Sequence, residues 1–577
     1  MPSTEVQRIV LLVALGVLGY VLVYTWTQDF GPGRQESPPF EEAPLIDTGA
    51  DPVIAEFPGE ESGVARESGQ GVQAPARDDD VPVGIAAPTA PQAETAPGAG
   101  AFENDERLVH VRTPVHEVWI DRRGGDIVRL KLPRFSEEVG GEETVTLLDQ
   151  RYDHIYVAQS GLIGADGGDS NGRPLYEAGA AEYVVEEGQF ELTLRHASDD
   201  VVLAKRFTFD ADDYLITVAQ DVVNRSAETF EAQMFAQLKR DATRPTKSGV
   251  PFGPRPYVGA AFTTPEDRYD KIDFEDLDDG TYRVEVTGGW AAVLQHYFVS
   301  SWVGTPGEVN AYYGRRLSDG NYAVGFVGPR FVVPPNQRAS VGAKLYVGPK
   351  DQRRLEQIAP HLNLTVDYGF LWWMSVPLFY VLDAIHSVVG NWGVAIILLT
   401  FCVKLLLYPL ASASYRSMAK MKKVMPQVKR LQERHSDNRQ KLSQEMMALY
   451  KKEGANPLGG CLPLVIQMPV FLALYWVLIE SVELRQAPFV FWIKDLAAMD
   501  SYFVLPLLYG VSFYAMQLLN PPPPDPMQAK VMKAMPIVFT ALFIFFPAGL
   551  VLYWLVNNLL SLLQQWYITR KVEKASA

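Results

Sequence analysis

The sequence predicts a multi-pass α-helical membrane protein that carries a large all-β sandwich domain outside the membrane. Three patterns predict this fold class: long apolar runs after residue 366, short alternating stretches over residues 103–362, and one isolated apolar run at residues 9–24. An apolar run of about 20 residues is long enough to cross a bilayer as a helix. Alternation with a period of two residues is typical of strands that cover one face of a core.

Composition argues against several classes of function. The chain has 577 residues and a formal net charge of -16, which argues against nucleic acid as its main partner. Its two cysteines, Cys402 and Cys461, both lie in apolar runs, so no disulfide supports the soluble region. The histidines show no spacing typical of metal ligands, and there is no Gly-rich phosphate-binding motif. We therefore expect neither a metal site nor a cofactor.

The N-terminal segment has two interpretations. The apolar run at residues 9–24 fits either a cleaved signal peptide or an uncleaved membrane anchor. A signal peptide ends in small residues of the Ala-x-Ala type, and none follow Tyr24, so we favour an anchor over residues 1–27. Residues 28–102 are rich in Pro, Gly, Ala and acidic residues, which predicts a disordered tether.

Short strands separated by turn residues predict a β-sandwich domain over residues 103–362. The clearest signal is a strand at 115–120, a Gly-containing turn, and a second strand at 127–132. Residues 350–361 predict a short helix that closes the domain. Further strands are predicted at residues 189–195, 204–209 and 214–218.

Helices follow the soluble domain. Residues 366–389 mix aromatic and aliphatic residues with Asp383 and His386, which predicts an amphipathic helix at the membrane surface rather than a span. Pro547 and Gly549 divide an apolar run that is too long for one crossing, which predicts a hairpin between two spans. The five spans predicted in this region are residues 390–411, 457–480, 501–520, 533–547 and 548–569.

Loop charge predicts the orientation. Residues 412–456 carry eleven Lys or Arg against four acidic residues, and basic loops face the cytoplasm. The short tail at residues 570–577 is also basic and then lies on the same side. Six spans in total therefore put both termini in the cytoplasm and the β domain outside.

The basic segment itself predicts an antiparallel helical hairpin, here called the basic hairpin (residues 412–456). Met421, Val424 and Val428 recur at helical spacing, and Met446 and Leu449 do so after a polar turn. A solvated charged loop and a plain helix–helix seam are the alternatives to a docking surface. The candidate docking residues are Arg416, Lys420, Lys422, Lys423, Lys429, Arg430 and Arg434.

Five long motifs then resemble one family, the YidC-type membrane protein insertases of bacteria. The longest is NPLGGCLPLVIQMPVFLALY at residues 456–475. The layout of an anchor, a large outer β domain and five further spans is similar to the Gram-negative form of this family. The other motifs are SQEMMALY (residues 443–450), SVELRQAPF (481–489), DPMQ (525–528) and FPAGLVLY (546–553).

The resemblance implies a fold and a function. Nascent membrane proteins would slide through a polar groove that is open to the cytoplasm and the lipid, alone or beside the SecYEG translocon. The chain would be a multi-pass protein of the bacterial inner membrane with a periplasmic β domain, and it would not be an enzyme. The basic hairpin would receive targeting factors, the ribosome or the translocon. Membrane lipids would be the remaining partners.

A single charge stands in an otherwise apolar predicted span. Lys404 falls where the resemblance implies an arginine in the groove, and Trp554 stands in place of a tyrosine. A lysine this close to the span's inner end also fits snorkelling to the headgroups, and polar residues in spans also fit simple interhelical hydrogen bonding. With the resemblance, the predicted groove residues are Lys404, Thr400, Gln467, Tyr553, Trp554, Asn557 and Ser561.

Two rival functions remain open at this point. A multi-pass transporter with an outer sensor domain should show paired repeats and intramembrane carboxylates, and we find neither. An envelope enzyme would use the β domain, but His116, Asp121 and Asp126 form no recognisable catalytic set. The insertase hypothesis predicts that a positively charged groove attracts acidic residues of the substrate.

Overall fold

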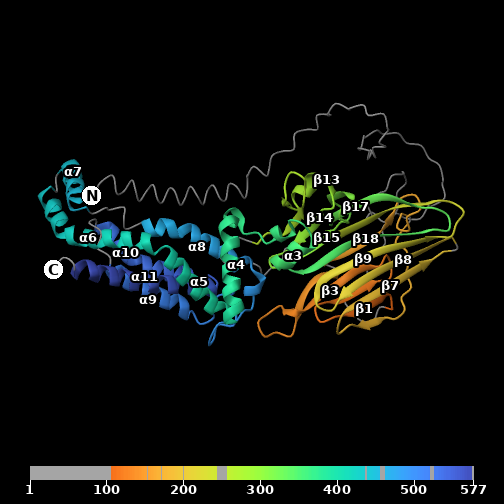
Figure 1. The fold of residues 1–577 in the computed structure, drawn as a ribbon, viewed down its shortest axis with the longest axis horizontal. Coiled ribbons are helices and arrows are strands. Elements are labelled where there is room, and N and C mark those ends of the chain that lie inside the picture. Colours follow the sequence, from red (N-terminus) through yellow and green to blue (C-terminus); the bar gives the residue numbers. More distant parts are fainter. Residues whose placement is uncertain are drawn as a thin grey trace, which may run out of the picture.

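The computed structural model of the chain describes residues 106–574, apart from residues 152–153, 171, 199, 244–255, 436–437, 455–461 and 520–525. The predicted anchor (1–27) and tether (28–102) lie outside the described residues. Figure 1 shows a β domain at one end and a bundle of helices at the other. One helix, α4 (Trp372–Val389), crosses between them.

The β domain is a sandwich of two sheets, as the alternating sequence pattern predicts. A 10-stranded sheet has the order β13-β16-β17-β10-β5-β4-β3-β2-β1-β6, and an 8-stranded sheet has the order β12-β11-β14-β15-β18-β9-β8-β7. The strands are β1 (Leu108–Arg112), β2 (Glu117–Asp121), β3 (Asp126–Ser136), β4 (Thr144–Arg151), β5 (His154–Ile163), β6 (Glu182–Val184), β7 (Gln189–Ala197), β8 (Val201–Asp210), β9 (Asp213–Asn224), β10 (Phe230–Arg240), β11 (Gly259–Phe262), β12 (Asp270–Ile272), β13 (Tyr282–Thr287), β14 (Trp290–Leu294), β15 (Phe298–Val303), β16 (Val309–Arg316), β17 (Tyr322–Val333) and β18 (Arg338–Pro349).

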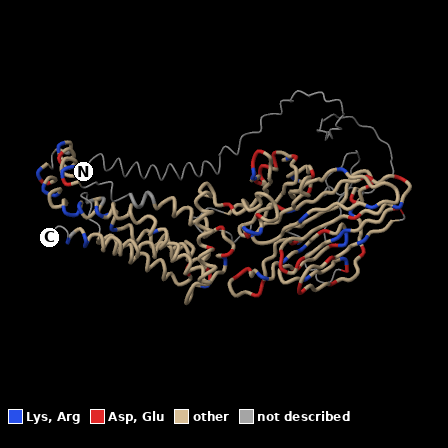
Figure 2. The backbone as a smooth tube through the Cα atoms, viewed as in Figure 1, with Lys and Arg blue, Asp and Glu red and all other residues tan. Residues whose placement is uncertain are grey.

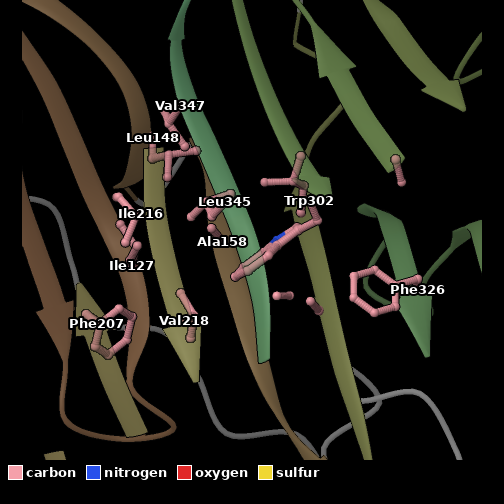
Figure 3. Packing of buried hydrophobic residues seen from close by; sticks show 14 of the residues in the cluster. Ile127, Leu148, Ala158, Phe207, Ile216, Val218, Trp302, Phe326, Leu345 and Val347 are labelled. Atoms are coloured by element: carbon pink, nitrogen blue, oxygen red, sulfur yellow. The ribbon is translucent and has the colours of Figure 1, made fainter. Parts of the chain in front are cut away.

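The sandwich core forms where the two inner faces meet. Along β8 the side chains alternate strictly, so Leu203, Phe207 and Phe209 point into the core and their neighbours do not. Figure 3 shows side chains from both sheets in this core, including Phe207 of the 8-stranded sheet and Ile127 of the 10-stranded sheet. Burial of apolar area at this interface is the main stabilising term of the domain.

Strand β14 of the smaller sheet is buried on both faces. In β14, Ala291 and Val293 face the sandwich core, whereas Trp290, Ala292 and Leu294 belong to a second core that continues into the helices. This second burial explains why β14 is a continuous apolar run rather than an alternating one. The β domain is therefore packed directly onto the helical part.

Polar residues inside the β domain stabilise its fold. Lys205 is fully buried and donates to Gly124 O (3.0 Å) and Ser160 O (2.9 Å), and burial lowers its pKa to about 7. Asp126 pairs with the buried Arg173. His116 is buried and its Nε2 lies 2.8 Å from Val347 O. His116 and Asp126, two of the residues considered for an envelope enzyme, therefore take part in buried polar contacts.

The helices have clear start and stop signals. Gly390 ends α4 in the left-handed conformation, and the Asn391 side chain then accepts from Val394 N (3.0 Å) to cap α5. Pro547 lies between α10 and α11. The helices are α2 (Asp276–Asp279), α3 (Gln352–Ile358), α4, α5 (Trp392–Leu406), α6 (Tyr408–Arg434), α7 (Arg439–Glu453), α8 (Leu462–Glu480), α9 (Val504–Leu519), α10 (Pro526–Phe543) and α11 (Ala548–Lys574), with short 3-10 turns η2 (Leu362–Thr365), η3 (Gly369–Leu371) and η5 (Val482–Leu484).

Length and composition together select few candidates for membrane-crossing helices among the described residues. Among the described residues, the only continuous helix long and apolar enough to cross a membrane is Gly369–Val389. Figure 1 shows that this helix runs across the direction of α5, α8 and α11. A second candidate joins α5 and α6 across a bend of 68°. The total of six spans stays a prediction.

Candidate functional site

The site is built around Lys404 on α5. The buried face of this helix carries Ile396, Leu399, Thr400 and Lys404, which follow helical spacing. The Lys404 side chain points into the bundle, and the residue is 7% exposed. This orientation favours the groove interpretation over snorkelling to the headgroups, which needs the ammonium at the helix end.

The Lys404 ammonium contacts neutral oxygens. Its Nζ donates to Ser561 Oγ on α11 (2.8 Å) and to Gln467 Oε1 on α8 (3.2 Å). No carboxylate pairs with it in the part of the chain that the structure describes. An ammonium has three N–H donors, so the two bonds leave one donor for an incoming group. A cation that is buried without a counter-charge attracts an anionic ligand.

Gln467 connects two helices beside this charge. Its Nε2 donates to Asn557 Oδ1 (2.5 Å) and to Tyr553 OH (3.1 Å), both on α11. Its Oε1 accepts from Lys404, so all hydrogen-bonding capacity of the amide faces the site. An amide in an apolar helix is stable only when it is paired in this way.

Ser561 connects the charge to the basic hairpin. Its Oγ donates to Asn557 O (2.7 Å) and accepts from Lys404. The hydroxyl of Tyr415, near the start of α6, also hydrogen-bonds to Ser561. Tyr415 packs with Ala411 of α6 and Ile568 of α11. Tyr415 is not among the groove residues predicted from the sequence. Its position on the apolar stripe of a basic helix was the signal that could have identified it.

Two predicted groove residues lie outside this network. The Thr400 hydroxyl donates to Ile396 O of its own helix (2.7 Å). Trp554 packs against Phe471 (4.8 Å between ring centroids) and Phe543 (5.8 Å), and its indole nitrogen is buried without a partner among the described atoms. These rings lie on the β-domain side of Gln467, so they bound the polar network in that direction.

The basic hairpin lies at the end of the bundle that is away from the β domain (Figure 1). Val424 and Val428 of α6 pack with Tyr450 of α7, as the helical spacing predicts. Figure 2 shows its concentration of Lys and Arg, in contrast to the acidic β domain. The candidate docking residues Arg416, Lys420, Lys422, Lys423, Lys429, Arg430 and Arg434 are all exposed.

Comparisons with known proteins cover the whole chain. A family model described as 60Kd inner membrane protein matches residues 384–575, and one described as YidC periplasmic domain matches residues 108–381. Membrane protein insertase YidC of Azotobacter vinelandii is 47% identical over 578 residues and covers 99% of each chain. The Stutzerimonas stutzeri protein of the same name is 46% identical over 572 residues, again covering 99% of each chain.

The chain belongs to the YidC family of membrane protein insertases. Members of this family insert inner-membrane proteins, and the transporter alternative is not favoured. The family assignment fits a site that holds hydrogen-bonding groups rather than a catalytic set.

Two solved structures are also similar to the chain. A crystal structure of an active YidC insertase, with its first transmembrane domain resolved, matches with a TM-score of 0.37 and 18% identity over 80% of this chain and 93% of that chain. A galactose mutarotase related enzyme from Lactobacillus acidophilus matches with a TM-score of 0.29 and 11% identity over 42% of this chain and 97% of that one. The second likeness gives no activity to this chain.

Proposed function

We propose that this YidC-family chain inserts its substrates through a hydrated groove whose working charge is Lys404. The hydrophilic outer segment of a nascent protein enters from the cytoplasm and exchanges water for the polar groups of the groove. The apolar part of the substrate leaves sideways into lipid, because burial of its CH2 groups in the acyl chains is favourable. No nucleotide is needed for this path.

The observation that carries the proposal is the unpaired ammonium. Lys404 Nζ has neutral partners on α8 and α11, with one donor left over. A carboxylate of the substrate segment satisfies that donor and supplies the missing counter-charge. Substrates with acidic outer segments are therefore the class that gains most from Lys404.

The short helices around the site support the same function. α5 has 15 residues and α9 has 16. At 1.5 Å per residue they are about 22–24 Å long, shorter than the roughly 30 Å hydrocarbon core of a bilayer. A polar groove in such a bundle leaves only a short apolar path for a hydrophilic segment to cross.

Orientation and partners belong to the same proposal. The exposed basic hairpin and the basic end of α11 face the cytoplasm, both chain termini lie there, and the β domain lies in the periplasm. The hairpin docks the ribosome, targeting factors or the SecYEG translocon, through surfaces that are negatively charged.

Site-specific photocrosslinking during synthesis of a small two-span substrate tests the proposal. A photoreactive residue at Gln467 should crosslink the nascent chain, because this side chain borders Lys404. Ile537, which is exposed on α10, is the matched control and should give lipid adducts. Equal crosslinking from both positions, or none from Gln467 in folded protein, contradicts a defined groove.

A further inference from the structure

The loop between α8 and α9 ties the outer end of the groove to the β domain. Arg485 Nη2 donates to Ser136 O at the end of β3 (2.6 Å). Further along the loop, Leu496 O and Ala498 O accept from the first backbone N–H groups of α11, those of Gly549 (2.9 Å) and Ala548 (2.7 Å). The position of this loop therefore sets the position of α11, which carries Tyr553, Asn557 and Ser561.

The same loop exposes a ladder of aromatic side chains. Phe491 is 89% exposed and Tyr502 is 68% exposed. Trp492 lies between them, with ring centroids 6.0 Å from Phe491 and 6.5 Å from Tyr502. A phenylalanine side chain this exposed contributes little to the stability of the protein. Exposed apolar patches of this kind mark binding surfaces.

The backbone of this loop adopts unfavourable conformations next to the exposed rings. Phe491 has φ 55° and Phe503 has φ 57°, a left-handed conformation that bulky residues rarely adopt. Asp500 is buried and fixes the geometry: it accepts from Trp492 Nε1 (2.9 Å) and from Leu505 N (2.8 Å). Strained conformations of this kind persist where the surrounding structure imposes them, and they cluster at functional sites.

A second aromatic group lies at the same end of the bundle. Trp372 and Trp373, at the start of α4, are 60% and 57% exposed. α4 lies between the bundle and the β domain, across the direction of the spans (Figure 1). Tryptophan and tyrosine are enriched at the interface between lipid and water, and an exposed Lys494 beside the ladder suits lipid phosphates.

We infer that the α8–α9 loop is a lipid anchor, whose aromatic ladder inserts into the headgroup region of the outer leaflet. The ladder and the α4 tryptophans together fix the depth of the bundle. Because the loop is bonded to the start of α11, this anchor also fixes how far the polar network lies below the outer headgroups. The inference does not depend on which residues contact the substrate.

Fluorescence quenching in nanodiscs tests the anchor. The full-length chain with Cys402→Ser and Cys461→Ser receives Phe491→Cys, labelled with an environment-sensitive fluorophore, in discs of phosphatidylethanolamine and phosphatidylglycerol. Nitroxide lipids carry the quencher either near the headgroup or near the end of the acyl chain. Val184→Cys on β6, an apolar position of the β domain that is 63% exposed, is the matched control.

The expected result is a blue-shifted emission from position 491 and strong quenching by the headgroup nitroxide, with weaker quenching by the deep nitroxide. The control should show neither. Tyr502→Cys serves as a second reporter if Phe491→Cys fails to fold. An unshifted, unquenched signal at both positions overturns the inference and leaves the ladder as a surface for another protein.

A stability measurement separates anchoring from packing. Phe491→Asn suits the left-handed conformation and removes the ring. Its thermal unfolding temperature in detergent should be no lower than that of the unchanged protein, because the ring packs against little of the chain. A clear drop would make Phe491 a packing residue and would contradict the anchor.

Discussion

Lys404→Ala removes the groove charge, and the structure allows its effect to be worked out. A substrate carboxylate about 4 Å from the ammonium gains about 4 kcal/mol at an effective dielectric constant of about 20. The carboxylate loses water, and Lys404 weakens its bonds to Ser561 and Gln467, each worth about 1 kcal/mol. The net preference for an acidic segment is then about 1.5–3 kcal/mol, which is about 10- to 150-fold in rate.

The assay is insertion of a two-span substrate into proteoliposomes, followed as protease protection of its outer segment. Two matched substrates carry Asp or Asn in that segment. Lys404→Ala should slow the Asp substrate by the factor above and leave the Asn substrate within about threefold, because only the Coulomb term is lost. Lys404→Arg is the control that keeps the charge, and it should keep most of the rate. Normal insertion of the Asp substrate by Lys404→Ala, or equal slowing of both substrates, refutes the reasoning.

Three further predictions follow from neighbouring residues. Gln467→Glu puts a carboxylate beside Lys404 and cancels its charge, so the Asp substrate should insert as slowly as with Lys404→Ala in the same assay. Gly510→Ala puts a Cβ against Thr540 Oγ1 where α9 meets α10, which should cost about 1–3 kcal/mol in the free energy of unfolding, measured in detergent. Burial lowers the pKa of His116 to about 4, so between about pH 6.5 and 4 the unfolded chain binds a proton at this residue and the folded protein does not. The free energy of unfolding should therefore fall by about 3 kcal/mol as the pH falls across that range, measured by denaturant unfolding followed by tryptophan fluorescence.

Each of these predictions has a control. Gln467→Met keeps the size of the side chain without a charge, and a defect as large as that of Gln467→Glu would contradict the electrostatic explanation. Thr540→Ala should recover part of the stability lost in Gly510→Ala, because it removes the overlapping oxygen. His116→Gln cannot titrate, so an unchanged loss of stability in acid would assign the effect to other groups.

Local patterns in the sequence predicted much of the fold. The alternating strands and the turn at Pro547 are each determined by residues next to one another in the chain. The double burial of β14 was not predicted, because a short apolar run does not reveal what covers its second face.

The candidate site likewise has features that the sequence predicted and features that it did not. The resemblance to the insertase family, rather than helical spacing, predicted that Lys404 lies in a groove with Gln467 and Ser561. The structure places Lys404 on the buried face of α5, where it bonds to both residues. Thr400 shares that face, but its hydroxyl bonds to its own helix, a choice that periodicity cannot decide. The Tyr415–Ser561 bond depends on the 68° bend between α5 and α6. Pro409 in the first turn of α6 marks this break, but the predicted span at residues 390–411 continued across it.

The measurement that tests the groove most directly uses the lysine itself. A carbodiimide joins an amine to a carboxylate without a spacer, so it can link Lys404 Nζ to an Asp of a stalled substrate, and mass spectrometry identifies the joined peptides. The account predicts a Lys404–Asp link that disappears in Lys404→Arg and with the Asn substrate. Links confined to exposed lysines such as Lys420, with none at Lys404 while the substrate is bound, would contradict it.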